Sequence, residues 1–372
     1  MKRLVLLGGG HAHVHVLQAM AREPMAGAMA MMITPFARQM YSGMVPGLVA
    51  GRYDEDACVI PLAPLAKAAG VQLVEASATA IDAAARTVTL SDGRVANFDL
   101  LSVDTGPVMD RDAIPGARVH GLFVRPIEHF VRLLPDLWAL ASKRPIDLVV
   151  VGAGAAGFEL ALGFAQRLRG LGGGASRVAL VTGGDEPLAA YPPAVIRRGL
   201  RALHAAGITV LQQACVGVKA DHVHLDNGAR VACDAPVMVV GSSAPAWLAG
   251  SGLALDARGF IATGPTLQSV SHPHVFAAGD VASRSDVSHP RSGVYAVRAG
   301  PPLALNLRRC IGGGALVSHQ PPARTLNLLS CSDGSAIATW GRWSAQGRWV
   351  WRWKDRIDRA FIARYVSPVT RA

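Results

Sequence analysis

The hydrophobic pattern of the chain repeats one unit, in which a short continuous apolar run is followed by glycines and then by a helical pattern. The clearest copy has an apolar run at Leu148–Val151, glycines at positions 152, 154 and 157, and helical spacing over Phe158–Leu168. A continuous run of this length is typical of a strand that is buried on both faces, as parallel sheets require. The pattern therefore predicts a strand, a tight turn and a helix in that order.

A second copy of this unit opens the chain. Lys2–Leu7 has the pattern of a buried strand, glycines follow at positions 8 to 10, and His13–Met20 has the pattern of a helix. His13 stands where such turns commonly carry a third glycine that lets the helix pack closely on the strand, so we expect a slightly wider separation. The next strand, Met29–Ile33, ends without an acidic residue that could hold a ribose.

Shorter patterns predict further strands and helices. The strands are expected at Val71–Ile81, Thr87–Leu90, Val95–Leu100, Leu100–Val103, Arg177–Val181, Thr209–Leu211, Val237–Val240 and His274–Ala278, and the helices at Ile127–Leu140 and Pro193–Ala206. Tyr41–Gly47 is expected to be a loop because of its glycines and proline, and Asp226-Asn227-Gly228 predicts a hairpin turn. Strands that alternate with helices predict an α/β protein with parallel sheets.

The C-terminal part of the chain is rich in tryptophan and arginine. Five of the seven tryptophans lie between positions 340 and 353, and Trp349, Trp351 and Trp353 alternate with other residues. We expect a strand there that places three indoles on one face, followed by a helix over Asp355–Tyr365. Aromatic and basic groups together suit an anionic membrane surface, which predicts peripheral membrane contact through residues 340–365. Packing on the chain's own nucleotide-binding domain or on a second subunit is the alternative.

Composition and charge restrict the class of protein. Hydrophobic residues make up 51% and charged residues 17% of the 372 residues, which indicates a folded chain with room for two or three domains. The net charge is +11, and +6 of it lies between Arg342 and the end of the chain. No motif supports nucleic-acid binding. No apolar run approaches the roughly 20 residues of a membrane span, so we expect a cytoplasmic protein, with attachment to the inner face of the membrane as the alternative.

The glycine turns predict dinucleotide binding. Backbone N–H groups at a helix N-terminus can face a pyrophosphate, and glycine leaves room for its approach. His11, His13 and His15 follow the first turn, but no carboxylate or cysteine completes a ligand set, so we expect no metal. The five cysteines are scattered and contain no Cys-x-x-Cys, which predicts neither a disulfide framework nor a zinc site.

Several landmarks in a fixed order resemble the pyridine nucleotide–disulfide oxidoreductase superfamily over about residues 1–310. They are Gly8 and Gly10, Thr105-Gly106, Gly152, Gly154 and Gly157 with Glu159, Gly241 with Pro245, and Gly279-Asp280. The resemblance implies two Rossmann-like three-layer α/β domains, the second inserted into the first, and a small C-terminal α+β segment. We expect an FAD-binding domain at 1–112 and 246–318, an NAD(P)-binding domain at 113–245, and the C-terminal segment at 319–372.

The same resemblance implies the site residues. FAD is expected at Gly8, Gly10, His11, Ala12, Pro46, Thr105, Gly106, Gly279, Asp280 and Tyr295, and NAD(P) at Gly152, Gly154, Ala155, Gly157, Glu159, Thr182 and Gly241. Glu159 matches a family position close to the nicotinamide and is the candidate catalytic residue; a solvated helix carboxylate is the alternative. Thr182 stands where NADH enzymes commonly carry an acid, and Arg197 and Arg198 could favour NADPH, so the donor stays open.

The cysteine positions exclude two branches of the superfamily. No cysteine stands near Tyr41–Gly47 for a redox disulfide, and none between Cys58 and Cys215 for sulfide oxidation. The chain looks like type II NADH dehydrogenases and, through Tyr41–Gly47, Gly293–Arg298 and the segment 351–359, is most similar to FAD proteins associated with selenide, water dikinase. Ala299 stands where the quinone motif would have glutamine. Two hypotheses remain: an NAD(P)H-oxidising flavoenzyme with a quinone or other small acceptor, or a flavoprotein partner of a dikinase. A homodimer fits either.

Overall fold

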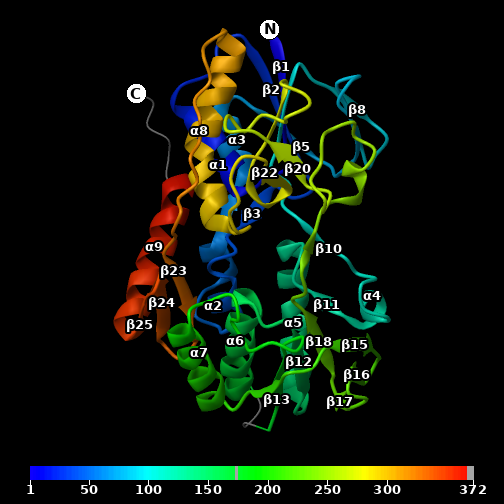
Figure 1. Cartoon of the computed structure of the whole chain (residues 1–372), viewed down its shortest axis with the longest axis vertical. Helices are drawn as coiled ribbons and strands as arrows, with labels where there is room; N and C mark the ends of the chain where they lie inside the picture. The colour runs from blue at the N-terminus through cyan, green and yellow to red at the C-terminus, as the bar shows by residue number, and fades with distance from the viewer. Residues whose placement is uncertain (172–174, 367–372) are drawn as a thin grey trace.

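Two parallel five-stranded sheets follow one another along the long axis of the molecule (Figure 1). The structure is a computed structural model and describes residues 1–171 and 175–366, so residues 367–372 of the predicted C-terminal segment lie outside it. The first sheet has the order β21 (Val275–Ala277), β9 (Leu100–Val103), β1 (Lys2–Leu7), β2 (Ala28–Thr34), β5 (Gln72–Glu75), and the second the order β11 (Leu122–Phe123), β18 (Ala235–Met238), β12 (Asp147–Val151), β13 (Arg177–Val181), β14 (Thr209–Leu211).

The chain leaves the first sheet after β9, builds the second sheet, and returns to the first with β21. This path and the parallel pairing confirm the predicted α/β class with Rossmann-like sheets. Nine helices lie in the described part of the chain: α1 (His11–Arg22), α2 (Val45–Val49), α3 (Leu62–Ala69), α4 (Ala117–His120), α5 (Ile127–Lys143), α6 (Ala155–Leu171), α7 (Pro193–Ala205), α8 (Gly293–Gly312) and α9 (Arg348–Val366). Helices α1, α3 and α8 pack together beside the first sheet.

Both faces of each sheet are buried, which is why the buried parts of the central strands β1 and β12 are apolar. Leu4 and Leu6 of β1 face the large core beneath α1 and α8, whereas Val5 and Leu7 face a second core under the small antiparallel strands. Those strands and the remaining short ones are β3 (Arg38–Met40), β4 (Val59–Pro61), β6 (Ala78–Asp82), β7 (Thr87–Leu90), β8 (Val95–Asn97), β10 (Val108–Met109), β15 (Cys215–Val218), β16 (His222–Leu225), β17 (Arg230–Ala232), β19 (Ser242–Ser243), β20 (Ile261–Thr263) and β22 (Ala282–Arg284).

Two of the predicted elements differ in the structure. The single strand expected at Val71–Ile81 is wrong, because β5 joins the parallel sheet while β6 pairs antiparallel with β7. The loop expected at Tyr41–Gly47 contains the start of α2, which has a proline in its first turn, where the fixed φ of proline suits a helix. The hairpin turn at Asp226–Gly228 is confirmed between β16 and β17.

A third prediction, the tryptophan-rich strand, is also wrong. Trp349, Trp351 and Trp353 belong to α9, which already begins at Arg348. The residues that α9 buries are Val350, Lys354, Asp358, Phe361, Ile362 and Tyr365, a spacing of three and four that the alternating indoles concealed.

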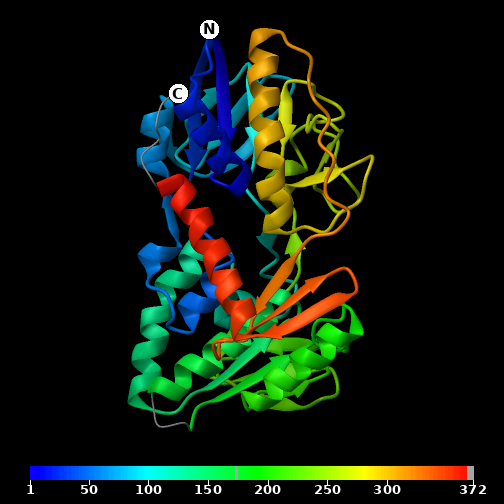
Figure 2. The same ribbon diagram turned by 90° about the vertical axis from the view of Figure 1, so that its left-hand side faces the viewer.

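The C-terminal segment connects the two halves of the molecule. Its antiparallel strands β23 (Asn327–Ser330), β24 (Ala336–Trp340) and β25 (Trp343–Gly347) pack against α6 and α7 of the second half. Helix α9 then runs back to the first half and contacts α1 and β4 (Figure 2). Within residues 1–171 and 175–366, no helix combines the length and apolarity that a membrane crossing requires.

Candidate cofactor-binding and active site

A cavity of about 390 Å³ lies at the carboxyl ends of β1, β2, β5 and β9, a position typical of ligand sites in parallel sheets. The cavity is lined by Thr34–Phe36 and Ala76–Ala78, by the first glycine turn, and by Ser42 and the start of α8. A volume of this size is within the range of sites for cofactors and drug-sized ligands. The cavity is therefore the candidate site for the dinucleotide of the first glycine turn.

The first glycine turn packs closely on the end of β9. Gly8 has a φ of +94°, and a Cβ there would lie 2.4 Å from the carbonyl oxygen of Asp104. A Cβ at Gly10 would lie 2.3 Å from Cγ of the same residue, and one at Gly279 would lie 2.5 Å from its Oδ1. These three positions therefore require glycine, because any side chain would meet Asp104.

Asp104 caps helix α1 from a different part of the chain. Its side chain is 3% exposed, and Oδ2 accepts hydrogen bonds from the backbone N–H groups of Ala12 at 2.8 Å and His13 at 3.0 Å. Burial raises the pKa of Asp104 to about 7, and the nearby carboxyl of Asp280 acts in the same direction, although the two N–H groups oppose the shift. The residue was not among the predicted site residues.

Asp280 and Arg125 face each other across the middle of the cavity. Arg125 Nη2 lies 3.9 Å from Asp280 Oδ2, and both residues line the cavity. Burial raises the pKa of Asp280, while Arg125 acts against the shift. A carboxylate here can accept hydrogen bonds from the hydroxyl groups of a bound cofactor, as the sequence suggested.

The first two histidines after the glycine turn have different surroundings. The ring of His13 is buried between Gly8, whose carbonyl oxygen lies 2.6 Å from Nδ1, and Ser102, whose Oγ lies 2.8 Å from Nε2. His11 lines the cavity, and its buried Nε2 has no hydrogen-bond partner among the described residues. Burial lowers the pKa of both rings to about 4, so both are neutral at pH 7. His11 therefore offers an unused polar atom beside the cavity.

The second glycine turn lies at the carboxyl end of β12, beside the ends of β13 and β18. Gly152 has a φ of +109° and approaches Val239 O, and a Cβ at Gly157 would lie 1.8 Å from Gly152 O. Gly154 has no atom within 4 Å of the position that a Cβ would take. This division of roles matches a dinucleotide turn: two glycines for packing and one that leaves the backbone open to a pyrophosphate. Ala155 begins α6 at this turn, and Thr182 and Gly241 follow the neighbouring strands.

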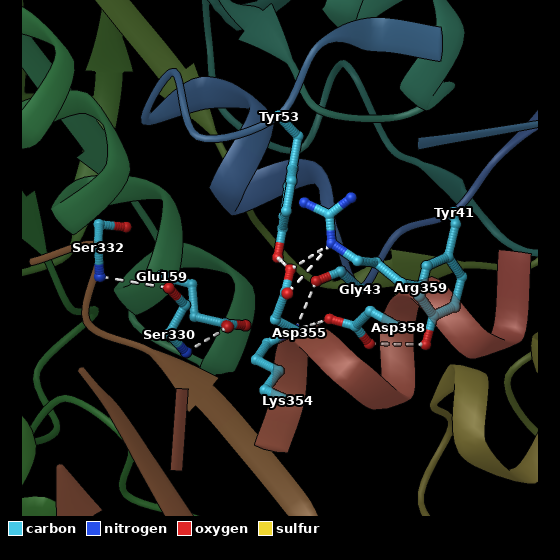
Figure 3. Close-up of polar contacts among 10 residues, drawn as sticks. All are labelled: Tyr41, Gly43, Tyr53, Glu159, Ser330, Ser332, Lys354, Asp355, Asp358 and Arg359. Carbon is cyan, nitrogen blue, oxygen red and sulfur yellow. Dashed lines mark hydrogen bonds and ion pairs between the residues drawn. The ribbon is translucent and has the colours of Figure 1, made fainter. Parts of the chain in front are cut away.

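Glu159 lies in the second turn of α6 and is half-buried. Its Oε1 accepts a hydrogen bond of 2.7 Å from the backbone N–H of Ser330 (Figure 3). Burial raises the pKa of Glu159 to about 7, although Lys354 acts against the shift. The side chain is thus held by the C-terminal segment and is not the solvated helix carboxylate that the alternative interpretation allowed.

The C-terminal helix supplies a buried ion pair beside Glu159. Lys354 Nζ lies 2.6 Å from Asp358 Oδ2 and donates to the carbonyl oxygen of Gly43 at 2.7 Å, and Tyr41 donates to Asp358 Oδ1 at 3.2 Å (Figure 3). The side chains of Lys354 and Asp358 are only 10% and 6% exposed. Segment 41–44, next to the flank of the cavity, is therefore fastened to α9.

The structure brings most predicted residues to the two sites. Six of the ten predicted FAD residues line the cavity: Gly8, Gly10, His11, Thr105, Gly106 and Asp280. Ala12 and Gly279 lie against Asp104, behind the cavity lining. The ring of Tyr295 stacks on the ring of His289, with their centroids 4.6 Å apart. Pro46 lies where α2 contacts α6. The sequence analysis missed Asp104, Arg125, Lys354 and Asp358. Asp104 follows an apolar strand, but nothing in the sequence marks the groups that it contacts.

Comparisons with known proteins identify the class. The family model described as pyridine nucleotide-disulphide oxidoreductase matches residues 2–300. An NADH dehydrogenase-like protein of Mycobacterium tuberculosis is 32% identical over 311 residues, which cover 78% of this chain and 75% of that protein. A probable ferredoxin reductase of Castellaniella defragrans is 26% identical over 300 residues, 76% of this chain and 68% of that protein.

Solved structures show the same fold. The sulfide:quinone oxidoreductase of Aquifex aeolicus superposes with a TM-score of 0.82 at 17% identity, over 98% of this chain and 92% of that one. NDH2 of Plasmodium falciparum, solved in complex with NADH, gives a TM-score of 0.81 at 11% identity over the full length of both chains.

The protein belongs to the pyridine nucleotide-disulphide oxidoreductase family. It is an oxidoreductase of this family, similar to an NADH dehydrogenase-like protein, and FAD and a nicotinamide dinucleotide are the cofactors that go with the family. The residues of the first cavity fit FAD, because the glycine turn would clash with any side chain and His11 and Asp280 offer polar atoms. The second turn fits the nicotinamide dinucleotide, because Gly154 is open.

Proposed function

We propose that this protein transfers a hydride from NAD(P)H to FAD and passes two electrons to a quinone or another small acceptor A. The overall reaction is NAD(P)H + H⁺ + A → NAD(P)⁺ + AH₂. The flavin supplies the redox chemistry when bound, and the chain supplies binding, orientation and electrostatics. None of the five cysteines lines the cavity, and the proposed route uses no redox disulfide.

One observation carries the proposal. Glu159 follows the second glycine turn on α6, and it lies beside Lys354, whose Nζ holds Gly43 next to the first cavity. A nicotinamide held at the second turn would therefore reach the flank of the first cavity near Ser42. Hydride transfer needs this kind of juxtaposition, because the reacting atoms must come within about 3–3.5 Å.

Anaerobic mixing with NADH and, separately, NADPH tests the proposal. Bleaching of the visible flavin band by either nucleotide is the expected result, and the faster one identifies the donor. Thr182 directly follows β13, and its hydroxyl donates to the carbonyl oxygen of Asp185; it leaves the choice of donor open, so both nucleotides must be compared. A flavin that neither nucleotide reduces would rule out the dehydrogenase.

Glu159→Gln tests the site residue. The amide keeps an acceptor for the Ser330 N–H but cannot hold a negative charge, so we expect the rate of flavin reduction to fall about tenfold or more with FAD content unchanged. Glu23→Gln at the exposed end of α1 is the matched control. A rate equal to that of the control would remove Glu159 from the proposed site.

We further propose that the outer face of α9 contacts an anionic membrane surface, where a quinone would be found. Trp349, Trp353 and Ile357 are 53%, 37% and 41% exposed, at a spacing of four residues. Arg352 and Arg356 are exposed between them. Trp351 is not part of this stripe, because its ring lies under the Arg52 guanidinium at 5.3 Å. The inner face of α9 meanwhile packs on the chain's own domains.

Co-sedimentation with vesicles containing phosphatidylglycerol tests this contact. The wild type is expected to bind these vesicles and not neutral ones, and Trp349→Ser/Trp353→Ser is expected to bind several-fold more weakly. Val119→Ser, which alters an apolar side chain on α4 that is 78% exposed, is the control. Equal binding by all variants contradicts the proposal, and a concentration-dependent change in mass would indicate a homodimer instead.

A redox partner of selenide, water dikinase is the second candidate. It is supported by the segment 351–359 in the sequence, whereas the relatives named above are a dehydrogenase-like protein and a ferredoxin reductase, which favours the dehydrogenase. Tight FAD with negligible NAD(P)H turnover, together with binding to a dikinase, would reverse this order.

A further inference from the structure

The two glycine turns differ in what lies beyond their second glycine. At Gly154, the space that a Cβ would take is empty to 4 Å. At Gly10, the same space holds the carboxyl group of Asp104, with Cγ at 2.3 Å and both oxygens at 2.4 Å. In a dinucleotide turn this space is left free so that the pyrophosphate can approach the helix N-terminus. A carboxyl group therefore stands beside the place where the first turn receives an anion.

Asp104 also uses hydrogen-bond donors that an anion would use. The N–H groups of Ala12 and His13 in the first turn of α1 both point to Asp104 Oδ2. Such groups carry the positive end of the helix dipole, which stabilises a negative charge most strongly when the charge lies directly at the helix N-terminus. The carboxyl group and a pyrophosphate thus share one helix N-terminus.

No cation balances this carboxyl group among the described residues. The titratable groups beside it are His13 of α1, whose N–H it accepts, and Asp280 in the turn after β21; His11 of α1 and Arg125 before α5 line the same cavity. Both histidines are neutral at pH 7, and Nη2 of Arg125 lies 3.9 Å from Oδ2 of Asp280. Helix α8 presents Ala296 to this region, with no charge. Adding a pyrophosphate would bring further negative charges close to an unpaired, buried carboxylate, which is costly.

We propose that Asp104 couples cofactor binding to a proton: its carboxyl group is protonated when the pyrophosphate of FAD lies at the N-terminus of α1. The inference rests on the assignment of FAD to the first cavity. In the protonated form, Oδ2 still accepts the two N–H groups, and Oδ1 carries the proton. Asp104 is then a positioning residue for the glycine turn, without a charge that repels the cofactor.

The direction of the pH dependence follows from this linkage. Without FAD, the raised pKa of Asp104, about 7, leaves the group largely ionised above neutral pH. In the complex the pyrophosphate favours the protonated form still more. Binding therefore takes up a proton above about pH 7, and the affinity for FAD falls as the pH rises, by up to about tenfold per pH unit. Well below pH 7 the affinity is flat, because both states are protonated.

The full-length protein, freed of its flavin, can be titrated with FAD between about pH 6 and about pH 9, with flavin fluorescence as the readout. Calorimetry in buffers of different ionisation enthalpy measures the protons taken up at the same time. Asp104→Asn keeps an oxygen for the two N–H groups and imitates the protonated carboxyl. Asp136→Asn, which removes an exposed carboxylate from α5, is the control for net charge.

We expect the dissociation constant of the wild type and of Asp136→Asn to rise above about pH 7 with uptake of up to one proton, and that of Asp104→Asn to stay flat and to be lower at alkaline pH. If the FAD dissociation constant of the wild type does not change with pH and no proton is taken up, the coupling is overturned, while the assignment of FAD to the first cavity stands. The coupling is also overturned if the FAD dissociation constant of Asp104→Asn rises with pH as steeply as that of the wild type. If Asp104→Asn does not fold, proton uptake by the wild type decides alone. Failure to bind FAD at any pH would overturn the assignment and the coupling together.

Discussion

At single positions, the glycines of the second turn separate packing from binding. A Cβ at Gly157 would lie 1.8 Å from the carbonyl oxygen of Gly152, whereas a Cβ at Gly154 would have no atom of the described residues within 4 Å. Gly157→Ala is therefore expected to destabilise the fold by about 3 kcal/mol. Gly154→Ala is expected to cost about 1 kcal/mol or less, because Ala is a poorer residue than Gly at a helix start.

For nucleotide binding, in contrast to stability, Gly154→Ala is expected to have a large effect. In Gly154→Ala the new methyl group lies where the pyrophosphate would approach, so we expect at least about tenfold weaker NAD(P)H binding in a protein of nearly normal stability. Urea denaturation and equilibrium titration with NADH and NADPH measure the two effects on the same samples. Normal nucleotide affinity in Gly154→Ala would mean that the nucleotide does not approach this turn.

The glycine turns could be predicted from sequence because their role is local: strand, glycines and helix are consecutive, and the backbone geometry follows from the residues themselves. Asp104 could not, because the N–H groups that it caps belong to residues 91 and 92 positions earlier. The apolar run at Leu100–Val103 predicted a strand and gave no sign that the next side chain would fold back under α1. Such contacts depend on which strands become neighbours.

Among the elements, α9 shows how a local pattern can mislead. The alternation of Trp349, Trp351 and Trp353 has the period of a strand, but only Val350 of the segment 349–353 is fully buried. What decides the structure is the core-facing set that continues through Lys354 and Asp358. A buried lysine and aspartate read as polar positions in the sequence, so the helical period was hidden until their pairing was seen.

The ion pair of α9 is expected to be one of its main anchors. Lys354→Met would leave Asp358 buried and without its cation, and would free the carbonyl oxygen of Gly43. We expect a loss of about 3 kcal/mol in the free energy of unfolding, as is usual when one partner of a buried pair is removed. Urea denaturation measures it, and the double variant Lys354→Met/Asp358→Leu should recover part of the loss.

Arg359 on the same helix provides the control. It pairs with Asp355 at the same spacing, but its side chain is 56% exposed, so Arg359→Met should cost about 1 kcal/mol or less. If Lys354→Met costs no more than Arg359→Met, the buried pair does not anchor the helix, and the attachment of segment 41–44 to α9 must come from the apolar contacts alone.

At the scale of the whole molecule, several contacts among the described residues join the two halves, among them that of α5 with β3. Helix α2 packs on α6, α9 runs from the second half back to the first, and Glu159 contacts the end of β23 (Figure 2). The order of the landmarks indicated that one domain is inserted in the other, but it carried no information on the angle between them. That angle depends on contacts between residues more than a hundred positions apart.

Gly163 is the position where this angle can be tested. A Cβ there would lie 2.9 Å from the carbonyl oxygen of Pro46 and 3.3 Å from Val49, so Gly163→Val must push α2 and α6 apart. The second glycine turn lies within the second half, and the first cavity is lined mostly by the first half with Arg125–Glu128 added from the start of α5, so both sites should keep most of their affinity. Hydride transfer requires that the two halves hold the nicotinamide and the flavin at the right distance, and a misplacement of about 1 Å can lower the rate about a hundredfold.

We therefore expect Gly163→Val to bind FAD and NAD(P)H normally and to reduce its flavin at least about tenfold more slowly in stopped-flow mixing. Gly170→Ala is the matched control, because it lies on the same helix with nothing within 4 Å of the added methyl group. It should reduce its flavin at the wild-type rate and gain about 1 kcal/mol of stability, since alanine favours the helix. A wild-type rate in Gly163→Val would show that the contact of α2 with α6 does not set the distance between the two cofactors, and would leave α9 and the contact of α5 with β3 as the elements that do.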